Sequence, residues 1–255
     1  MTNLPIGVLD SGLGGLTVAS EIIKLLPKEQ IIYFGDSKNI PYSKKSKKRI
    51  FQLSKNIVEF LIKNKAKIIV IACNTITVSA INDLRKLFQD IPIVGTVPVI
   101  KTAVKATHNG RIGIFSTKKT AESIYQRNLI KEFAKSVKVL NLGSDEIVPK
   151  IEQGKSIKTI LEKELLPFRK AGVDTLALGC THYSLVKEDI RKIMGSNVKI
   201  IDSGAAVARQ VRRVLEANNS QSKFSEPNEY YTTADTVQIK KVIKLLGLSG
   251  FVTRI

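Results

Sequence analysis

The chain has 255 residues, of which 43% are hydrophobic and 25% are charged; this composition fits a folded globular protein and excludes a disordered one. Its formal net charge is +19, but most of the basic residues are Lys, which is less suited than the planar Arg guanidinium to paired contacts with bases or phosphates. No apolar run reaches the length of a membrane span and the first residues lack a secretory signal, so we expect a cytoplasmic protein with no membrane partner.

Short apolar runs rich in β-branched residues alternate with amphipathic stretches along the chain, a pattern typical of buried parallel strands joined by helices. Strands are expected at Ile6–Leu9, Ile31–Phe34, Ile68–Ala72, Ile93–Val94, Arg111–Phe115, Lys138–Asn141, Thr175–Leu178 and Lys199–Ile201. Helices are expected at Thr17–Leu26, Lys45–Lys63, Val78–Phe88, Thr120–Lys131, Ser156–Arg169, Ala205–Leu215 and Val237–Leu246. The polar segment from Asn218 to Glu229 is expected to be a loop. This order of elements predicts a doubly wound α/β protein.

Two stretches of the chain resemble each other. Residues 68–88 (IIVIACNTITVSAINDLRKLF) and residues 175–194 (TLALGCTHYSLVKEDIRKIM) each place an apolar strand before a turn with Cys and Thr, followed by a helix. The repeat predicts two parallel-sheet α/β domains related by pseudo-symmetry, with the active site in the cleft between them. We expect residues 1–97 and 207–255 to form the domain that carries Cys73, and residues 98–206 to form the domain that carries Cys180.

Polar residues cluster where the expected strands end. In the first domain these are Asp10-Ser11, Asp36-Ser37 and Cys73-Asn74-Thr75, and in the second they are Ser116-Thr117 and Cys180-Thr181-His182. Ligands of open α/β sheets bind beyond the carboxyl ends of the strands. These side chains are therefore the candidates for a binding site.

The two Cys are the most informative candidates. Two Cys and two His in the whole chain cannot supply a disulfide framework and argue against a structural zinc site, so no metal is expected. A Cys at a strand-to-helix junction lies near backbone N–H groups that stabilise a thiolate, although one such Cys alone is more often a small buried hydrophobe. Two thiols in repeated contexts suit a racemase, in which one base removes an α-proton and the other returns a proton to the opposite face.

Neighbouring residues fit supporting roles. Asp10 could bind a substrate ammonium or tune one Cys, and His182 could be the proton partner of Cys180. Ser11, Asn74, Thr75 and Thr181 offer donors for a carboxylate, although each could equally be a helix cap.

The glycines at 12, 14 and 15 do not indicate a nucleotide site. The third glycine of G-x-G-x-x-G would fall at position 17, which is Thr17, and no Walker A sequence is present. We interpret these glycines as permitting a tight turn and a close approach of the backbone to a small ligand.

The motifs resemble those of the glutamate racemases, cofactor-independent isomerases that supply D-glutamate for peptidoglycan and hence for cell wall biogenesis and cell shape. The matching segments span almost the whole chain: GVLDSGLGGLTV (7–18), YFGDSKNIPYS (33–43), IACNT (71–75), VPVIKTA (97–103), LALGCTHYSL (176–185), IDSGAAVAR (201–209) and YYTTAD (230–235). The paired CNT and GCTHY motifs, together with DSGxGG, are the most specific of these.

The resemblance implies a site and an assembly. It implies Cys73 and Cys180 as catalytic bases assisted by Asp10 and His182, with no cofactor, glutamate as substrate and a homodimer. It also implies substrate contacts from Asp10, Ser11, Tyr42, Ser43, Asn74, Thr75, Thr117, Thr120, Thr181 and His182, and an auxiliary acid at Glu152. The family usually has Gly where this chain has Ser43, so a backbone contact there survives only if the φ angle of Ser43 is negative.

Two alternatives stay open at this stage. A racemase on the same scaffold could act on aspartate or a hydantoin. A basic nucleic-acid-binding protein is the alternative of another class; the net charge supports it, whereas the low aromatic content of 6% and the absence of Trp count against it, so no specific nucleic-acid partner is expected.

Overall fold

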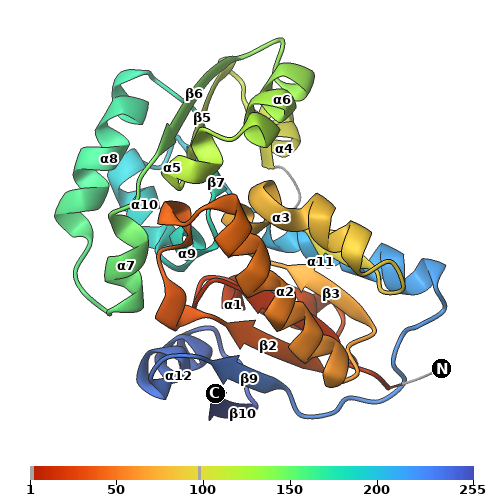
Figure 1. Cartoon of the computed structure of the whole chain (residues 1–255). Helices are drawn as coiled ribbons and strands as arrows, with labels where there is room; N and C mark the ends of the chain where they lie inside the picture. Colours follow the sequence, from red (N-terminus) through yellow and green to blue (C-terminus); the bar gives the residue numbers. More distant parts are fainter. Residues whose placement is uncertain (1–2, 97–98) are drawn as a thin grey trace. The chain divides into compact units, whose positions relative to one another are not determined.

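A computed structural model describes residues 3–96 and 99–255, and the chain divides into two compact units, Met1–Val97 with Gly204–Ile255 (unit 1) and Pro98–Ser203 (unit 2) (Figure 1). Each unit is built on a sheet whose strand pairs are all parallel. The prediction of two parallel-sheet α/β units is therefore confirmed. Within the described ranges, no helix is both long and apolar enough to cross a membrane.

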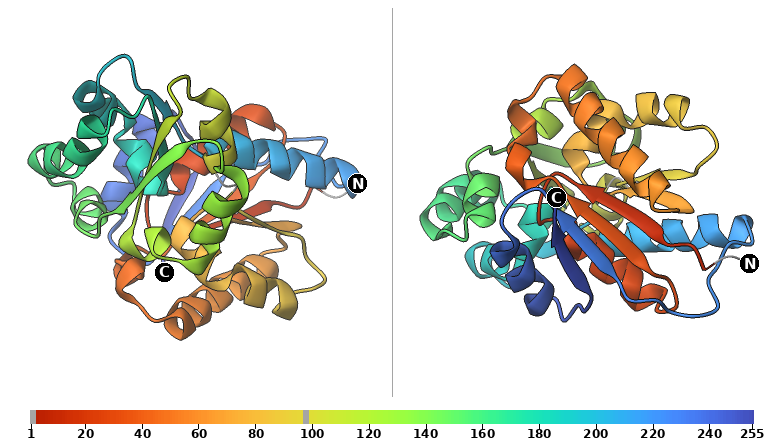
Figure 2. Two further views of the ribbon diagram at one scale, coloured as in Figure 1. Left: turned by 90° about the horizontal axis from the view of Figure 1, so that it is seen from above. Right: turned by 60° about the horizontal axis from the view of Figure 1, so that its bottom comes forward.

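Unit 1 contains a six-stranded sheet with the order β10-β9-β2-β1-β3-β4. Its strands are β1 (Ile6–Asp10), β2 (Ile31–Gly35), β3 (Ile68–Ile71), β4 (Ile93–Gly95), β9 (Glu229–Thr232) and β10 (Phe251–Arg254). Its helices are α1 (Leu16–Leu25), α2 (Lys47–Lys63), α3 (Asn74–Leu87), α11 (Gly204–Ala217) and α12 (Thr236–Leu245), with 3₁₀ turns η1 (Ser37–Asn39) and η2 (Tyr42–Lys44). Helices α1 and α11 pack together on one face of the sheet and α2 and α3 on the other (Figure 2), which is why β1, β2 and β3 are buried along their whole length.

Unit 2 contains a four-stranded sheet with the order β6-β5-β7-β8. Its strands are β5 (Arg111–Ser116), β6 (Lys138–Gly143), β7 (Thr175–Gly179) and β8 (Lys199–Ile201). Its helices are α4 (Val99–Ala106), α5 (Lys118–Ala121), α6 (Ile124–Phe133), α7 (Ile147–Glu152), α8 (Lys158–Lys170), α9 (Thr181–Leu185) and α10 (Lys187–Met194). Helix α4 packs against α6, and α8 packs against α10.

The two sheets share one topology. In unit 1 the first four strands lie in the order β2-β1-β3-β4, and in unit 2 the strands lie in the order β6-β5-β7-β8. Each order is second, first, third, fourth along its own segment. Cys73 follows the third strand of the first set and Cys180 follows the third strand of the second. The internal repeat in the sequence therefore reflects two copies of one strand arrangement, each with its Cys in the equivalent position.

Several expected elements need correction. The helix expected at Thr120–Lys131 is two helices, α5 and α6, because the Ser123 hydroxyl accepts a hydrogen bond from the backbone N–H of Gln126 and starts a new helix there. Helix α3 begins at Asn74 rather than at Val78, so its N-cap is Cys73 itself. Strands β9 and β10 and helices α4, α7 and α9 were not expected, and residues 97 and 98 of the VPVIKTA motif lie outside the described part.

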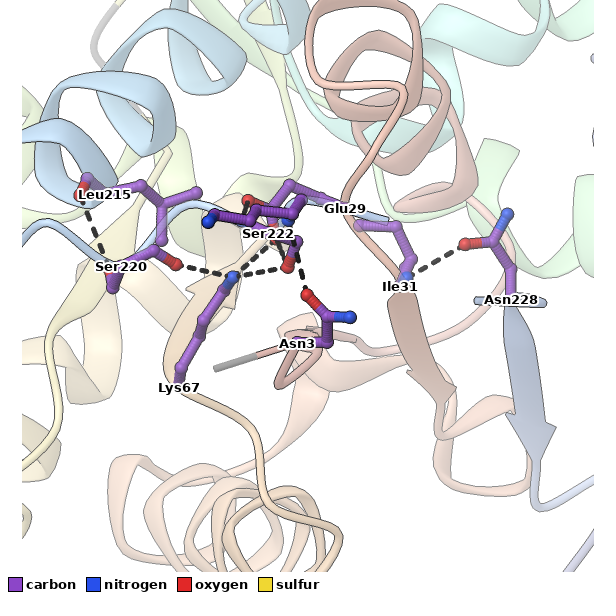
Figure 3. Close-up of polar contacts among 9 residues, drawn as sticks. Asn3, Glu29, Ile31, Lys67, Leu215, Ser220, Ser222 and Asn228 are labelled. Carbon is purple, nitrogen blue, oxygen red and sulfur yellow. Dashed lines mark hydrogen bonds and ion pairs between the residues drawn. The ribbon is translucent and has the colours of Figure 1, made fainter. Parts of the chain in front are cut away.

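The buried ion pair between Lys67 and Glu29 holds in place the segment that leads from α11 to β9 (Figure 3). Lys67 Nζ lies 2.6 Å from Glu29 Oε2, and the two side chains are only 5% and 3% exposed. Lys67 also donates to the Ser220 carbonyl (2.7 Å) and the Ser222 hydroxyl (2.9 Å), while Glu29 accepts from the Ser222 N–H (2.8 Å). Because Glu29 precedes β2 and Lys67 precedes β3, this cluster lies at the amino ends of the strands, away from their carboxyl ends.

Candidate active site

The carboxyl ends of three adjacent strands gather the candidate residues of unit 1. Strands β2, β1 and β3 are neighbours in the sheet and are followed by Asp36, by Ser11 and by Cys73, with Asp10 as the last residue of β1. The Cys73 thiol donates a hydrogen bond to the Ser11 hydroxyl across 3.5 Å, and both residues are buried. The structure thus brings Ser11 and Cys73 into contact, although they are 62 positions apart in the chain.

Cys73 stands at the N-terminus of a long helix. It is the N-cap residue of α3, a helix of 14 residues, so the backbone N–H groups of the first turn and the positive end of the helix dipole favour negative charge at its thiol. Thr75, in the first turn, is buried, and the side-chain oxygen of Asn74 is buried with no hydrogen-bond partner among the described residues. A buried amide oxygen of this kind is an acceptor that a ligand ammonium can satisfy.

Asp10 is fully buried and is held in place by the glycine-rich turn that follows it. One carboxyl oxygen accepts a hydrogen bond from the Gly12 N–H at 3.1 Å. A Cβ atom at Gly15 would lie 2.5 Å from the Asp10 Cβ, closer than real atoms allow. Gly15 has a further role, because its missing side chain makes room for Asp10, while the close approach of this turn to a ligand stays a prediction.

The Tyr42–Ser43 segment forms a 3₁₀ turn, η2, beside α3. Tyr42 is buried in the hydrophobic core that also contains Cys73, and its hydroxyl donates to Asp36 Oδ2 at 2.7 Å. Ser43 has the negative φ of a 3₁₀ turn; in the described ranges, positive φ angles outside glycine occur at Lys65 and Asn219. The condition under which Ser43 can replace the glycine usual in the resembling family is therefore met without strain.

In unit 2 the candidate residues follow β5 and β7, which are neighbours in the sheet. Thr117 caps α5: its hydroxyl accepts from the Thr120 N–H and donates to the Thr120 hydroxyl at 3.0 Å. Both threonines are buried, as is Thr181 after Cys180. The structure therefore places Thr117 and Thr120 together, while Cys180 starts the neighbouring short helix α9.

Cys180, His182 and Glu152 form a buried chain of polar contacts. His182 Nε2 lies 2.5 Å from Glu152 Oε1, with side chains 2% and 9% exposed, and the ring also makes a hydrogen bond to Cys180. Burial alone would lower the pKa of His182, but the hydrogen bonds to Cys180 and Glu152 and the charge of Glu152 outweigh it and raise the pKa well above its usual value. These contacts favour the protonated form of His182, whose positive charge would lie beside the Cys180 sulfur.

Tyr183 is a site-forming residue that the sequence interpretation missed. It is fully buried, it packs on Phe115 with ring centroids 4.6 Å apart, and its hydroxyl donates to the carbonyls of Ser116 (3.1 Å) and Ser144 (3.0 Å). These contacts join the residue after Cys180-Thr181-His182 to the ends of β5 and β6. The only sequence signal for this role was its place in the GCTHY motif.

Comparison with known proteins places the chain in a family. The model of the Asp/Glu/hydantoin racemase family matches residues 6–211. The chain belongs to the Asp/Glu/hydantoin racemase family. It is 39% identical over 249 residues to a glutamate racemase of Clostridium perfringens, covering 96% of this chain and 95% of the relative.

Solved structures of racemases share the fold. The chain superposes on glutamate racemase isoform RacE1 of Bacillus anthracis with a TM-score of 0.88 and 32% identity, covering 99% of this chain and 97% of the other. It superposes on a glutamate racemase of Francisella tularensis, solved in complex with D-glutamate, with a TM-score of 0.86, 30% identity and the same coverage. Within residues 3–96 and 99–255 of this racemase family member, no group of three His, Cys, Asp or Glu side chains is arranged to hold a metal ion.

Proposed function

We propose that this chain is a glutamate racemase that interconverts L- and D-glutamate by proton transfer between two thiols, without a cofactor. The observation that carries the proposal is the repeated placement of one Cys after the third strand of each sheet, Cys73 in unit 1 and Cys180 in unit 2. The family match, the glutamate racemase relatives and the structural neighbour solved with D-glutamate support the same substrate. The product serves peptidoglycan synthesis, the general role of this enzyme.

The proposed reaction moves one proton off the α-carbon and another onto it. A thiolate accepts the α-proton, so the C–H bond breaks, an S–H bond forms and the electron pair stays on carbon. The second thiol then donates its proton to the opposite face and becomes the thiolate. This mechanism requires both sulfurs at one substrate carbon, so that either enantiomer meets a thiolate on its hydrogen-bearing side.

Polar neighbours of each thiol fit supporting roles. Asp10 and Ser11 are assigned to Cys73, and His182 is assigned to Cys180, with a contact to Glu152 that favours the protonated imidazole. The unpartnered Asn74 oxygen suits a substrate ammonium. The proposed hydrogen-bond donors to the substrate carboxylates are N–H and hydroxyl groups of Thr75, Thr117, Thr120, Thr181 and the Tyr42–Ser43 segment.

Deuterium exchange tests substrate, mechanism and site together. Wild-type protein incubated with each glutamate enantiomer in D₂O is expected to racemise it and to incorporate deuterium at the α-carbon. Cys73→Ser and Cys180→Ser, which keep the shape of the side chain, are each expected to abolish racemisation, because Ser is a far weaker acid than Cys. Full racemisation by either variant would overturn the two-thiol mechanism. Faster turnover of aspartate or a hydantoin by the wild type would reassign the substrate.

We also propose a cytoplasmic location and a homodimer. Both Cys are free thiols in the structure, which suits a reducing compartment. Sedimentation at micromolar concentration tests the dimer, since a monomeric mass would contradict it.

A further inference from the structure

Asp36 is a buried acidic residue to which the proposed mechanism assigns no role. It follows β2 directly and is only 3% exposed. Its Oδ2 accepts a hydrogen bond from the Tyr42 hydroxyl (2.7 Å), and its Oδ1 accepts from the Asn39 side-chain amide (3.0 Å) and from the Thr233 hydroxyl (2.8 Å). Within the described part of the chain, none of the ion pairs includes Asp36. Burying a carboxyl group without a cation is costly, so this arrangement is a poor device for stability alone.

The contacts of Asp36 converge on one short segment. Thr233, which follows β9, donates to Asp36 and accepts a hydrogen bond from the backbone N–H of Lys38 at 3.0 Å. Asn39 in η1 and Tyr42 in η2 bind the same carboxyl group. Asp36 therefore joins both 3₁₀ turns of the segment 37–44 to the C-terminal part of unit 1.

Tyr42 connects the segment 37–44 to the surroundings of Cys73. Its ring packs in the core that contains Cys73 and Ile76. Burial is the main reason that the pKa of Tyr42 is raised, and the charge of Asp36 and its hydrogen bond raise it further, as do the charges of Cys73 and Asp10. Its hydroxyl thus stays protonated and donates to Asp36, so Tyr42 holds position and does not exchange protons.

We propose that Asp36 is a positioning residue. Through its hydrogen bonds to Tyr42, Asn39 and Thr233, it fixes the Tyr42–Ser43 segment in the position from which that segment can bind the substrate carboxylate. The inference rests on the proposed glutamate racemase function for its consequence, but the anchoring itself is a property of unit 1. Thr233 lies after α11 and is far in sequence from every candidate residue of the site. The proposal therefore adds a functional residue from the C-terminal part of the chain.

Two conservative variants test the proposal. Asp36→Asn keeps the shape but cannot accept at both positions, and Thr233→Val removes one donor to the carboxyl group and the acceptor for Lys38. Both are expected to raise KM for each glutamate enantiomer, by about tenfold for Asp36→Asn, while kcat changes less, because binding and not proton transfer is affected. Backbone amides of residues 37–44 are expected to exchange with D₂O faster than in the wild type. Asp83→Asn, the same change at an exposed site on α3, is the matched control and is expected to leave both readouts unchanged.

The outcomes separate the positioning role from a structural one. A lowered melting temperature with unchanged KM and unchanged exchange in 37–44 would overturn the proposal. If Asp36→Asn fails to fold, Thr233→Val, which leaves the Tyr42 contact intact, decides by the same two readouts. A wild-type protein that does not racemise glutamate would refute the proposed function, and the hydrogen exchange would still test the anchoring.

Discussion

At the scale of single residues, Gly15 packs against Asp10 so closely that no side chain fits between them. A Cβ at position 15 would lie 2.5 Å from the Asp10 Cβ and 2.9 Å from its Cγ, and both atoms belong to the short stem of a fully buried side chain. Gly15→Ala should therefore displace Asp10 and cost about 1–3 kcal/mol of stability. We expect kcat/KM to fall by at least about tenfold, measured with both enantiomers, since a small misplacement of a reacting group has a large kinetic effect.

The control for this change is Gly195→Ala. Gly195 has φ +91°, and a Cβ added there would meet no atom within 4 Å, so alanine loses stability through backbone strain alone. Equal losses of activity in the two variants at matched stability would show that Asp10 is not the group affected.

Asp174 gives a pH-dependent prediction. It accepts hydrogen bonds from the Thr107 hydroxyl (2.6 Å) and from the backbone N–H groups of His108 (2.8 Å) and Asn109 (2.7 Å). Burial alone would raise the pKa of Asp174, but these bonds outweigh it and lower the pKa to about 2 from 3.8. A lowered folded-state pKa contributes stability that is complete above about pH 4 and is lost as the pH falls toward 2. After allowance for solvent screening, the contribution is about 1 kcal/mol.

Urea unfolding of wild type and Asp174→Asn at two pH values measures this contribution. The difference in unfolding free energy between the two proteins should be larger at pH 6 than at pH 3, because the wild-type carboxylate is partly titrated at the lower pH in the unfolded chain. Asp90→Asn, an exposed site, should show no such pH dependence. A difference in unfolding free energy that increases as the pH falls would contradict the lowered pKa of Asp174.

At the scale of elements, the sequence predicted strands β1 to β8 and missed β9 and β10. Strands β1 to β8 were expected because apolar β-branched runs mark them. Strand β9 alternates between half-buried and buried residues, and the edge strand β10 is mostly exposed, so neither has such a run. Helices α4, α7 and α9 are of eight residues or fewer, too short for a clear helical period.

The candidate site, too, could be predicted from the sequence only in part. Residues at strand ends, such as Asp10 and Cys73, could be found because parallel strands deliver their carboxyl ends to one edge. Contacts that depend on packing between segments far apart in the chain could not be predicted from the sequence. No local pattern connects Asp36 to Thr233, and the pairing of His182 with Glu152 follows from the packing of α7 against α9.

The buried cluster of Lys67 and Glu29 is the element-scale contact with the largest expected effect on stability. Lys67→Ala would leave Glu29 buried without a cation and would release the segment at Ser220 and Ser222 (Figure 3). We expect a loss of about 3–5 kcal/mol in urea unfolding. The double variant Lys67→Met with Glu29→Gln should be more stable than Lys67→Ala, because it leaves no unpaired buried charge.

The matched comparison is Lys55→Ala, which breaks the exposed pair with Glu59 (3.0 Å; side chains 32% and 48% exposed) and should cost no more than about 0.5 kcal/mol. Similar small losses at Lys55 and Lys67 would mean that the buried pair does not hold the segment.

At the scale of the whole molecule, the charge of +19 acts on stability and on substrate binding in opposite ways. The repulsion among 41 basic side chains, set against 22 acidic ones, destabilises the folded state, while the same positive field attracts an anion such as glutamate. Salt weakens both effects, because the screening length falls from about 30 Å at 0.01 M to about 10 Å at 0.1 M.

Raising NaCl over that range should therefore increase the melting temperature by a few degrees and also increase KM for glutamate. KCl at equal ionic strength should give the same shifts if screening is the cause. The Lys67–Glu29 pair should not respond, because it is buried, so the stability lost in Lys67→Ala should be nearly the same at both salt concentrations. A melting temperature that falls with salt would mean that attraction between the exposed ion pairs outweighs the repulsion of the net charge.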